Sequence, residues 1–495
     1  MVDDKPRPAL TAKTKILYGL GSTGTGINLR TSNAFLMIFY SQAIGVPAAA
    51  VATVMMIAAI FDALVDPFVG QVSDNLRTRW GRRHPLMYAA ALPTALAYFL
   101  IWSPPDFLSP SALPLYLLGC LLVLRFCDTL FELPAVSLAP ELTSDYAGRT
   151  GLIAVRRAFE MGGGYLMVLA GYEWFMRETA NGGGGVSSPE GYHMLGLVGG
   201  LMIFSTILVS TYSTHRFIPF LSSPPQRKLA FRDFLREMKQ TLDNKAFIII
   251  AAAGAIYATG VGVTQSLQVY LNLYFWGLSQ GQVALLATIQ IPASLLGVAL
   301  APVLVRRYGK KFTAILFPAL ALTTTLASPT LQLLGLLPEG SALFAYLATE
   351  AVISQVMFVI GVATVPSMVA DVVEEIEVRT GRRSEGLIFS ADNMARKFVS
   401  SFGVFIAGLI LTFVAFPVRA HPGQVDGDVL NHLILMWMGS ITLFIGGSIV
   451  VLSFFPITRE RHENNLRILA ERGAPLPADD GASLPPDEDL SPRRI

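Results

Sequence analysis

The chain has 495 residues, of which 53% are hydrophobic and 15% are charged, with a formal net charge of +2 and a mean hydropathy of +0.53. Soluble domains carry about 25% charged residues, so this composition excludes an ordinary water-soluble domain and indicates a chain that buries much of its surface in lipid. A net charge so close to zero also gives no strong electrostatic case for binding nucleic acid.

The chain begins with a short polar segment and then turns apolar. Residues 1–14 are polar and basic, and we expect a cytoplasmic N-terminus there rather than a cleavable signal peptide. Apolar segments of about 20 residues, the length that crosses a bilayer, then recur along the chain. Six of them form a predicted N-terminal half over residues 15–215, with spans at 15–43, 48–75, 84–103, 112–138, 149–173 and 193–214.

A second set of apolar segments follows a hydrophilic central loop, 216–244. These form a predicted C-terminal half over residues 245–456, with spans at 245–275, 280–304, 311–334, 341–369, 385–416 and 430–456. Residues 457–495 are charged and proline-rich, which predicts a disordered cytoplasmic tail. The predicted fold class is an all-α membrane protein of twelve transmembrane helices in two six-helix halves.

Basic residues gather in the loops on one side of the predicted bundle. The loops that follow spans 2, 8 and 10 carry Arg77, Arg79, Arg82, Arg83, Arg306, Arg307, Lys310, Lys311, Arg379, Arg382 and Arg383. Short cytoplasmic loops are enriched in Lys and Arg. We therefore expect a multi-pass protein of the plasma membrane with both termini in the cytoplasm.

Two of these loops resemble one another. The sequence RWGRR at 79–83 follows span 2, and RYGKK at 307–311 follows span 8. Matching loops in two sets of six spans predict parallel halves related by an axis along the membrane normal. The alternative is that any cytoplasmic loop attracts arginine and glycine.

Ionisable residues inside apolar spans are the main functional signal, because each costs about 2.5–3.5 kcal/mol on insertion scales and usually faces a cavity or a partner. Span 2 carries Asp62 and Asp66, whose spacing puts both carboxylates on one helix face. Two such carboxylates cannot both stay ionised without a bound Na⁺, a proton or a basic partner. Oxygen ligands suit a hard cation, so the pair predicts a cation site. A salt bridge that locks two helices is the alternative.

Spans 4 and 5 carry further charges. Asp128 and Glu132 again lie four residues apart, and Thr129 between them adds a hydroxyl group. Span 5 carries Arg156 and Glu160 on one face, where an ion pair within the helix is the alternative to a role in binding.

Spans 1 and 11 supply cations. Arg30 lies in span 1, and Lys397 in span 11 is the natural counter-charge for the acids of span 2, across the two halves. Carboxylates and cations from five spans would form one central polar cavity. Such a cavity predicts either a binding site for a solute and an ion or an interlocked gate.

The motifs that carry these residues are KILYGLG at 15–21, FDALVDPFVGQVSDNLRTRWGRRHP at 61–85, FELPAVSLAPELT at 131–143 and ADVVEEIEVRTGRRSEGLIFSADNMARK at 370–397. In these motifs the chain resembles the glycoside–pentoside–hexuronide:cation symporters of the major facilitator superfamily, the family typified by melibiose permease. The resemblance covers nearly all of residues 13–456. It implies the major facilitator fold and cation-coupled symport of a sugar, glycoside or hexuronide.

The resemblance also implies roles for individual residues. Asp62, Asp66 and Thr129 match the family's cation ligands, with the two aspartates holding Na⁺ if coupling is to sodium. Glu132 matches an aspartate that binds sugar hydroxyls next to the cation, so it is a candidate for both the cation site and the solute site. Arg156 matches an arginine near the sugar.

Lys397 matches the family's lysine on span 11, and Asp128, Asn393 and Arg30 complete the candidate solute-binding set. One departure from the family affects the solute. The family's sugar-binding aspartate on span 1 is Gly26 here, and Arg30 follows one turn later. This change removes a carboxylate and adds a cation, which suits an anionic solute such as a hexuronide better than a neutral galactoside.

The resulting hypothesis is a secondary active transporter that works by alternating access. Cation binding at span 2 would neutralise charge that otherwise prevents the halves from rocking. The inner gate would be held by ion pairs between the arginine-rich loop and nearby acids. Its candidate residues are Arg79, Arg82, Arg83, Asp74, Glu141 and Asp145.

The expected partners are a small solute, a monovalent cation and the bilayer, with no nucleic acid, no cofactor beyond the coupling ion, and a monomeric state. The related sodium-dependent lysolipid symporters of vertebrates share the motifs, so a lysolipid or other amphiphile is an alternative solute. A non-transporting membrane sensor with the same fold is the alternative from another class. An enzyme is disfavoured because the spans show no nucleophile–base or metal-ligand pattern.

Overall fold

The computed structural model describes residues 8, 10–143, 145–177, 185–221, 244–380, 385–457 and 459–473. Within helices it leaves out the side chains of 146, 147, 379, 380, 385–395, 397, 459, 466, 469, 470, 472 and 473. Throughout these ranges the regular structure is helical, and no strand occurs in them.

Six long helical segments form the N-terminal half. The first of them is a continuous run of α and π turns, and the fifth ends in a π turn. The elements are α1 (Ala12–Leu20), α2 (Ser22–Thr31), η1 (Ser32–Leu36), η2 (Phe39–Ile44), α3 (Ala48–Asn75), α4 (His84–Trp102), α5 (Leu113–Leu142), α6 (Tyr146–Ala170), η3 (Gly171–Phe175) and α7 (Pro189–His215), followed by the short η4 (Ile218–Phe220).

Six further segments form the C-terminal half, and one shorter helix follows them. The elements are α9 (Lys245–Tyr270), η5 (Leu271–Phe275), α10 (Gln280–Tyr308), α11 (Lys310–Leu333), α12 (Ser341–Thr380), α13 (Glu385–Phe413), α14 (Gly427–Ile441), η6 (Thr442–Gly446), α15 (Gly447–Ser453) and α16 (Arg459–Gly473).

The twelve segments lie where the apolar runs predicted spans, and most bounds agree within a few residues. The largest difference is α12, which continues to Thr380, well beyond the predicted end at 369. One prediction was wrong. The stretch 459–473 was expected to be disordered, but it forms α16, whose basic side chains pair with acids at the end of α12. Composition did not reveal this helix, because its partners lie some 90 residues earlier in the chain.

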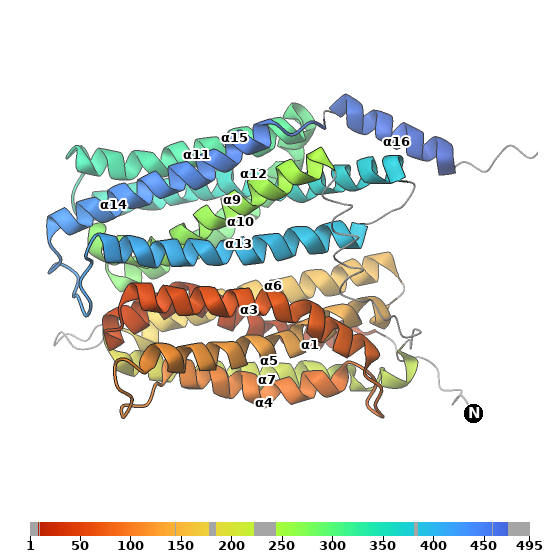
Figure 1. The fold of residues 1–495 in the computed structure, drawn as a ribbon, viewed down its shortest axis with the longest axis horizontal. Helices are drawn as coiled ribbons and strands as arrows, with labels where there is room; N and C mark the ends of the chain where they lie inside the picture. Colours follow the sequence, from red (N-terminus) through yellow and green to blue (C-terminus); the bar gives the residue numbers. More distant parts are fainter. Residues whose placement is uncertain are drawn as a thin grey trace, which may run out of the picture.

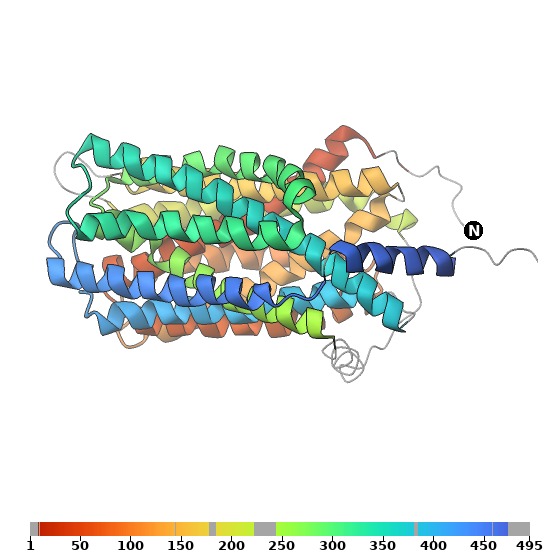
Figure 2. The same ribbon diagram turned by 90° about the horizontal axis from the view of Figure 1, so that it is seen from above.

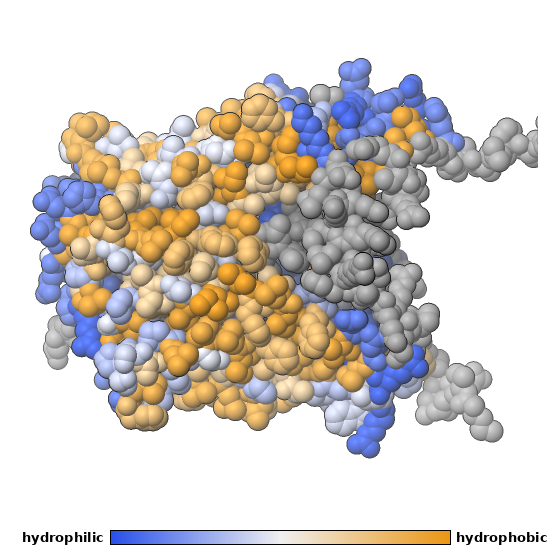
Figure 3. Space-filling model, in the orientation of Figure 1, coloured by the Kyte–Doolittle hydropathy of each residue, from blue (hydrophilic) through white to orange (hydrophobic). Residues whose placement is uncertain are grey.

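The outer surface of the bundle is apolar between two polar ends. Figure 3 shows a hydrophobic belt across the middle of the molecule, with hydrophilic residues at its two ends. In the described part of the chain, nine helical segments are long and apolar enough to cross a membrane. The three remaining segments are the first span, α6 and α13. The described side chains of α13 include an apolar stretch of only 16 residues, Phe398–Phe413, and the first span is divided among several short elements.

The two halves pack as two layers. Figure 1 shows the N-terminal half, red to yellow, below the C-terminal half, green to blue, and Figure 2 gives the same bundle from above. Equivalent neighbours recur in both halves: α2 packs on α6 as α9 packs on α13, and α3 packs on α5 as α10 packs on α12. Across the halves, the most extensive packing joins α3 to α13. This repetition supports two parallel six-helix units.

Very close approaches of helix backbones hold each half together. A Cβ atom added at Gly26 of α2 would lie 1.9 Å from the Glu160 backbone oxygen of α6. In the C-terminal half, a Cβ atom added at Gly403 of α13 would lie 2.2 Å from the Thr259 backbone oxygen of α9. Both positions therefore require glycine, the residue that lets backbones in membranes approach this closely.

The bundle has two unlike ends. The end that holds the start of α1 and α16 is here called the terminal end, and the opposite end is called the distal end (Figure 1). Toward the distal end, polar contacts join the halves: Ser41 hydrogen-bonds to Tyr270, and the Ala420 N–H donates to Gln42 at 2.9 Å. The Arg419 guanidinium donates to the Ile44 carbonyl at 2.9 Å. In this structure the halves are thus fastened together at the distal end.

Candidate ion and solute site

Three oxygen-bearing side chains from α3 and α5 converge inside the N-terminal half. Asp62 and Asp66 lie on the face of α3 that packs on α5, and the Thr129 hydroxyl of α5 lies 3.2 Å from a carboxylate oxygen of each. Thr129 is 5% exposed, while the two aspartates are partly accessible. The structure therefore brings together all three residues that the resemblance implied as cation ligands.

The local sequence of α3 adds a further acceptor near this group. Pro67 directly follows Asp66 inside the helix. Proline has no backbone N–H, so the carbonyl of Ala63, one turn earlier, loses its helical hydrogen-bond donor. In a membrane span such a carbonyl is tolerated where it lines a cavity or meets another donor. The arrangement of two carboxylates and one hydroxyl can bind a hard cation, or it can share a proton.

A second polar cluster lies along the same face of α5 and extends to α2 and α6. Thr25 of α2 is 3.3 Å from both Asp128 and Glu132, and the Asn28 amide donates to Asp128 at 3.2 Å. Arg156 of α6 donates to Glu132 at 2.7 Å. This cluster combines carboxylates, a hydroxyl, an amide and a guanidinium, the groups that hydrogen-bond sugar hydroxyls and carboxylates.

The two clusters share α5. Thr129, which bonds the aspartates of α3, is the residue next to Asp128, and Glu132 lies one turn further on. A cation bound at Asp62 and Asp66 would therefore change the charge within one helical turn of Asp128 and Glu132. At this distance, a charge at one cluster changes the electrostatic potential at the other.

Thr25 and Asn28 are the site residues that the sequence analysis missed. They lie three residues apart on α2, and this spacing places them on the same helix face, toward α5. That polar pair was the available signal. Gly26 lies between them on α2. The close approach of α6 leaves no room for a side chain at Gly26, and Thr25 supplies the contact to α5.

The structure resolves which arginine of α6 pairs with which acid. The alternative of an Arg156–Glu160 pair within the helix is wrong. Arg156 reaches across to Glu132, while Arg157 pairs with Glu160 at 2.7 Å. Arg156 is buried and its partner reaches it from another helix, whereas Arg157 is largely exposed.

Other predicted solute residues lie apart from this cluster or outside the described side chains. Arg30 lies over the Tyr165 ring of α6 at 4.6 Å, and no described carboxylate is within ion-pair distance of it. Asn393 and Lys397 belong to α13, but their side chains are outside the described residues. The proposed charge pairing of Lys397 with α3 therefore remains a prediction.

The predicted gate residues divide into two groups. Arg82 and Arg83 both pair with Glu141, Arg83 at 2.6 Å, and both lie within 4.0 Å of Asp74. Burial lowers the pKa of the Arg83 guanidinium, and the Glu141 carboxylate opposes that shift.

Arg79 and Asp145 do not belong to this ion-pair group, which corrects the predicted gate. Arg79 lies over the neighbouring Trp80 ring at 5.8 Å. Asp145 caps α6 by accepting a hydrogen bond from the Gly148 N–H at 2.7 Å, as N-terminal aspartates commonly do. Its carboxylate is thus used locally, within its own helix.

An apolar bundle of two six-helix halves, with a polar site on helices that face its interior, defines a membrane transporter of the major facilitator type. A family model described as "MFS/sugar transport protein" matches residues 17–459. The chain belongs to this family, which covers both halves.

Relatives of known name are similar in sequence to this chain along most of their length. An isoprimeverose transporter of Lactiplantibacillus pentosus is 24% identical over 89% of this chain and 88% of its own. A glucuronide carrier protein homolog of Escherichia coli is 23% identical over 91% of this chain and 94% of its own. An uncharacterized symporter of Synechocystis is 25% identical over 91% of this chain and 95% of its own.

Solved structures support the fold. The nucleoside transporter NupG aligns with a TM-score of 0.58 at 14% identity, covering 92% of this chain and 98% of its own. The xylose transporter XylE of E. coli, in an inward-open conformation, aligns with a TM-score of 0.56 at 12% identity. The alignment covers 92% of this chain and 99% of XylE. The family consists of membrane transporters, so this chain is a transporter of small solutes and not an enzyme.

Proposed function

We propose that this transporter is a symporter that couples the entry of a sugar-like solute to a monovalent cation, Na⁺ or H⁺. The observation that carries the proposal is the position of Thr129, whose hydroxyl lies 3.2 Å from both Asp62 and Asp66 inside a membrane span. Charged groups at that depth are costly, and a cation bound between the two carboxylates offsets that cost. The cation would sit at these three residues.

The solute would bind at the adjacent cluster. Asp128, Glu132, Thr25 and Asn28 offer acceptors and donors for hydroxyl groups, and Arg156 offers a guanidinium. With no side chain admitted at Gly26, this part of α2 contributes one carboxylate fewer than in the related sugar symporters. The reduced negative charge favours a sugar acid, such as a hexuronide, over a neutral galactoside.

Coupling would follow from electrostatics. With the cation absent, the carboxylates on α3 and α5 repel one another and an anionic solute. With the cation bound, the local charge falls and the solute can bind at Glu132 and Arg156. Both would bind while the distal end is open. The halves would then rock, closing the distal end through the contacts of Gln42, Ser41 and Arg419 and opening the terminal end.

The membrane orientation is part of this proposal. The basic loops lie at the terminal end, and the excess of arginine and lysine in cytoplasmic loops supports placing that end and both termini in the cytoplasm. The structure would then be a form closed toward the outside of the plasma membrane. We further propose that a single chain transports, without a cofactor beyond the coupling ion.

Uptake into proteoliposomes tests the proposal. The purified chain would be given radiolabelled glucuronate, a methyl pentoside, a methyl galactoside or a lysophospholipid at fixed pH, with an inward Na⁺ gradient, an inward proton gradient or neither. We expect one cation gradient to raise the uptake of a sugar solute at least tenfold over the gradient-free control. Uptake that no cation gradient stimulates would contradict symport, and stimulated uptake of the lysophospholipid alone would favour the amphiphile alternative.

A further inference from the structure

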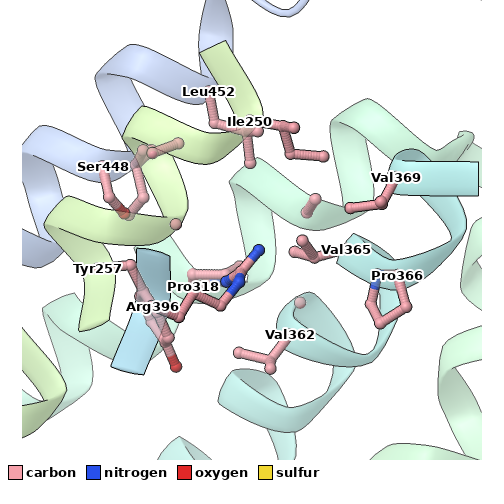
Figure 4. Close-up of a pocket in the computed structure, with 15 residues that line it drawn as sticks. Ile250, Tyr257, Pro318, Val362, Val365, Pro366, Val369, Arg396, Ser448 and Leu452 are labelled. Carbon is pink, nitrogen blue, oxygen red and sulfur yellow. The ribbon is translucent and has the colours of Figure 1, made fainter. Parts of the chain in front are cut away.

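A cavity lies inside the C-terminal half, away from the polar site of the N-terminal half. It has a volume of about 260 Å³, is partly open, and is lined by α9, α11, α12, α13 and α15. Figure 4 shows its wall of aliphatic side chains, including Ile250, Val362, Val365 and Leu452. Among its fifteen lining residues, three carry a polar side-chain group: Tyr257, Arg396 and Ser448.

Arg396 gives this cavity its chemical character. Its guanidinium points into the middle of the cavity, between the wall of α12 and that of α9 and α15 (Figure 4). The residue lies about 16 Å along α13 from the first residue of that helix, deep in the membrane-spanning part of the bundle. An arginine at such depth costs several kcal/mol, and it is retained where an anion or another acceptor repays that cost.

The backbone of α9 approaches this guanidinium closely at Gly254. A Cβ atom added at Gly254 would lie 2.7 Å from the Arg396 Cζ atom, so any larger residue there would displace the side chain. Arginine presents five N–H donors in a rigid fork. Even a guanidinium that makes one interaction keeps N–H donors for a further acceptor. Carboxylates and sulfonates match the geometry of these donors.

The other two polar side chains of the cavity, Ser448 and Tyr257, already make contacts within the protein. The Ser448 hydroxyl is used by its own helix, donating to the Ile445 carbonyl at 3.0 Å. The Tyr257 ring stacks on Phe358, with ring centroids 5.8 Å apart. The rest of the wall can contact an apolar group but cannot satisfy several hydroxyl groups, so an unsubstituted sugar is a poor match.

The cavity volume limits the size of the apolar group. A cavity of about 150 Å³ lined by aliphatic side chains is enough to bind benzene. This cavity of about 260 Å³ can therefore hold one ring together with a small anionic group. A long acyl chain would not fit within it.

We propose that this cavity binds a small amphiphilic anion, with its carboxylate or sulfonate on Arg396 and an apolar group of about one ring among Ile250, Val365 and Leu452. The site is separate from Asp62, Asp66, Arg156 and Glu132, and the proposal does not depend on symport. Because Arg396 comes from α13 and the apolar wall comes mainly from α9 and α12, a bound ligand ties these helices together.

Three matched probes test the ligand class. Benzenesulfonate carries a ring and a permanent anion, methyl phenyl sulfone is a neutral molecule of similar size, and methanesulfonate is the anion without the ring. Binding to the full chain in lipid nanodiscs would be measured by calorimetry, with empty nanodiscs subtracted. We expect benzenesulfonate to bind at least tenfold more tightly than either of the others. Equal binding of benzenesulfonate and methanesulfonate, or no binding of benzenesulfonate, would overturn the proposal.

Two variants and their controls test the location. Arg396→Gln should weaken benzenesulfonate binding at least tenfold, and Val365→Phe should weaken it by filling the cavity. Arg306→Gln, at an exposed arginine, and Val298→Phe, at a valine that is 56% exposed, are the matched controls and should bind as the parent does. If Arg396→Gln fails to fold, Val365→Phe decides alone. Unchanged binding in Val365→Phe would show that the probe binds elsewhere and would refute the assignment.

Benzenesulfonate binding and cation-driven uptake are separate measurements. Loss of sodium- or proton-driven uptake with intact binding would refute symport and leave this site standing. Intact uptake without benzenesulfonate binding would do the reverse.

Discussion

The α3 helix of the N-terminal half and the α10 helix of the C-terminal half occupy equivalent places but carry different groups. Asp62 and Asp66 lie 17 and 13 residues before Arg79, the first residue of RWGRR (79 − 62 and 79 − 66). Counted in the same way from Arg307, the first residue of RYGKK, the equivalent positions are Gln290 and Ser294 (307 − 290 and 307 − 294).

The partners of these positions lie on corresponding helices, α5 and α12. Thr129 of α5 bonds the aspartates of α3, while Gln355 of α12 donates to Ser294 at 2.9 Å. Neutral side chains are therefore sufficient to join the second and fourth spans of a half. The carboxylates of α3 are thus not required for packing against α5, which strengthens the case that they bind a cation.

Arginines show a second contrast between the halves. Arg156 on α6 and Arg396 on α13 lie at similar depths, ten and eleven residues from the first residue of their helices (156 − 146 and 396 − 385). Arg156 pairs with Glu132 in a polar cluster, whereas Arg396 points into an apolar cavity. The same framework thus supports a hydrophilic site in one half and an amphiphilic one in the other.

The largest effect is expected when the two aspartates of α3 are replaced by the residues at the equivalent positions of α10. The double variant Asp62→Gln, Asp66→Ser should fold, because Gln290 and Ser294 occupy equivalent places in α10, but it should lose cation-driven uptake by at least 100-fold. Proteoliposome uptake under the gradient that drives the parent chain measures this. Asp106→Asn, at an exposed loop aspartate, is the control. Uptake within threefold of the parent would remove the cation site from α3.

A smaller loss is expected from breaking the Arg156–Glu132 pair. Arg156 is 5% exposed, and removing one partner of a buried pair costs about 3–5 kcal/mol. Arg156→Gln and Glu132→Gln should each lower uptake about 30- to 100-fold. If the two residues act as a unit, the double variant should be no worse than either single variant. Fully additive losses would show that they act independently. Arg157→Gln, on the exposed neighbour, should leave uptake nearly unchanged.

The ion pairs at the terminal end allow the halves to be compared in stability. Glu141 pairs with both Arg82 and Arg83, whose side chains are largely buried. Asp371 pairs with Lys310 at 2.5 Å, and the Lys310 side chain is 28% exposed. Glu141→Gln should lower stability by about 3 kcal/mol, because two guanidinium groups lose their nearer carboxylate and keep only the more exposed and more distant Asp74. Asp371→Asn should cost less, because Lys310 can turn its ammonium toward water. Thermal unfolding in detergent measures both, and the reverse order would contradict this assignment.

Helix spacing in the N-terminal half depends on Gly26. Gly26→Ala would place a methyl group 1.9 Å from the Glu160 backbone oxygen, so α2 and α6 must separate. Overpacking of this kind costs about 1–3 kcal/mol. Gly162→Ala on α6, where no atom lies within 4 Å of the added Cβ, is the matched control and should be neutral or slightly stabilising. Equal melting temperatures for the two variants would show that the contact at Gly26 is loose.

These positions show how much of the molecule the sequence could predict. Apolar length fixed the spans closely, because a bilayer sets the length of a helix that crosses it. The spacing of Asp62 and Asp66 on one face was equally readable, since helix geometry alone decides it. Thr129 was found through resemblance, and its contacts with both aspartates required the packing of α5 on α3.

What the sequence could not give depends on contacts between distant segments. For Arg156 the sequence left open an ion pair with Glu160 and a role in binding, and its pairing with Glu132 follows from the packing of α6 beside α5. The tight approach at Gly26 and the pairing of Arg461 with Glu375 likewise involve residues far apart in the chain. The composition of a local segment does not indicate which distant residues will contact it.

The smallest effect concerns α16, which has no described counterpart at the end of the N-terminal half. Arg461 donates to Glu375 at 2.5 Å and His462 lies 2.9 Å from Glu374, so basic side chains of α16 hold it against the acidic end of α12. Arg461 is 50% exposed, and such pairs contribute at most about 1 kcal/mol and weaken in salt.

Arg461→Gln should therefore leave the melting temperature almost unchanged while making the α12–α16 contact easier to open. Limited proteolysis of α16 should be about threefold faster in the variant at low salt, and the difference should shrink at 1 M salt, because the lost contact is electrostatic. Arg467→Gln, whose arginine is 73% exposed and interacts within α16 itself, is the matched control and should be cleaved at the parent rate. Equal cleavage of all three proteins would mean that apolar packing, rather than these ion pairs, fastens α16 to the C-terminal half.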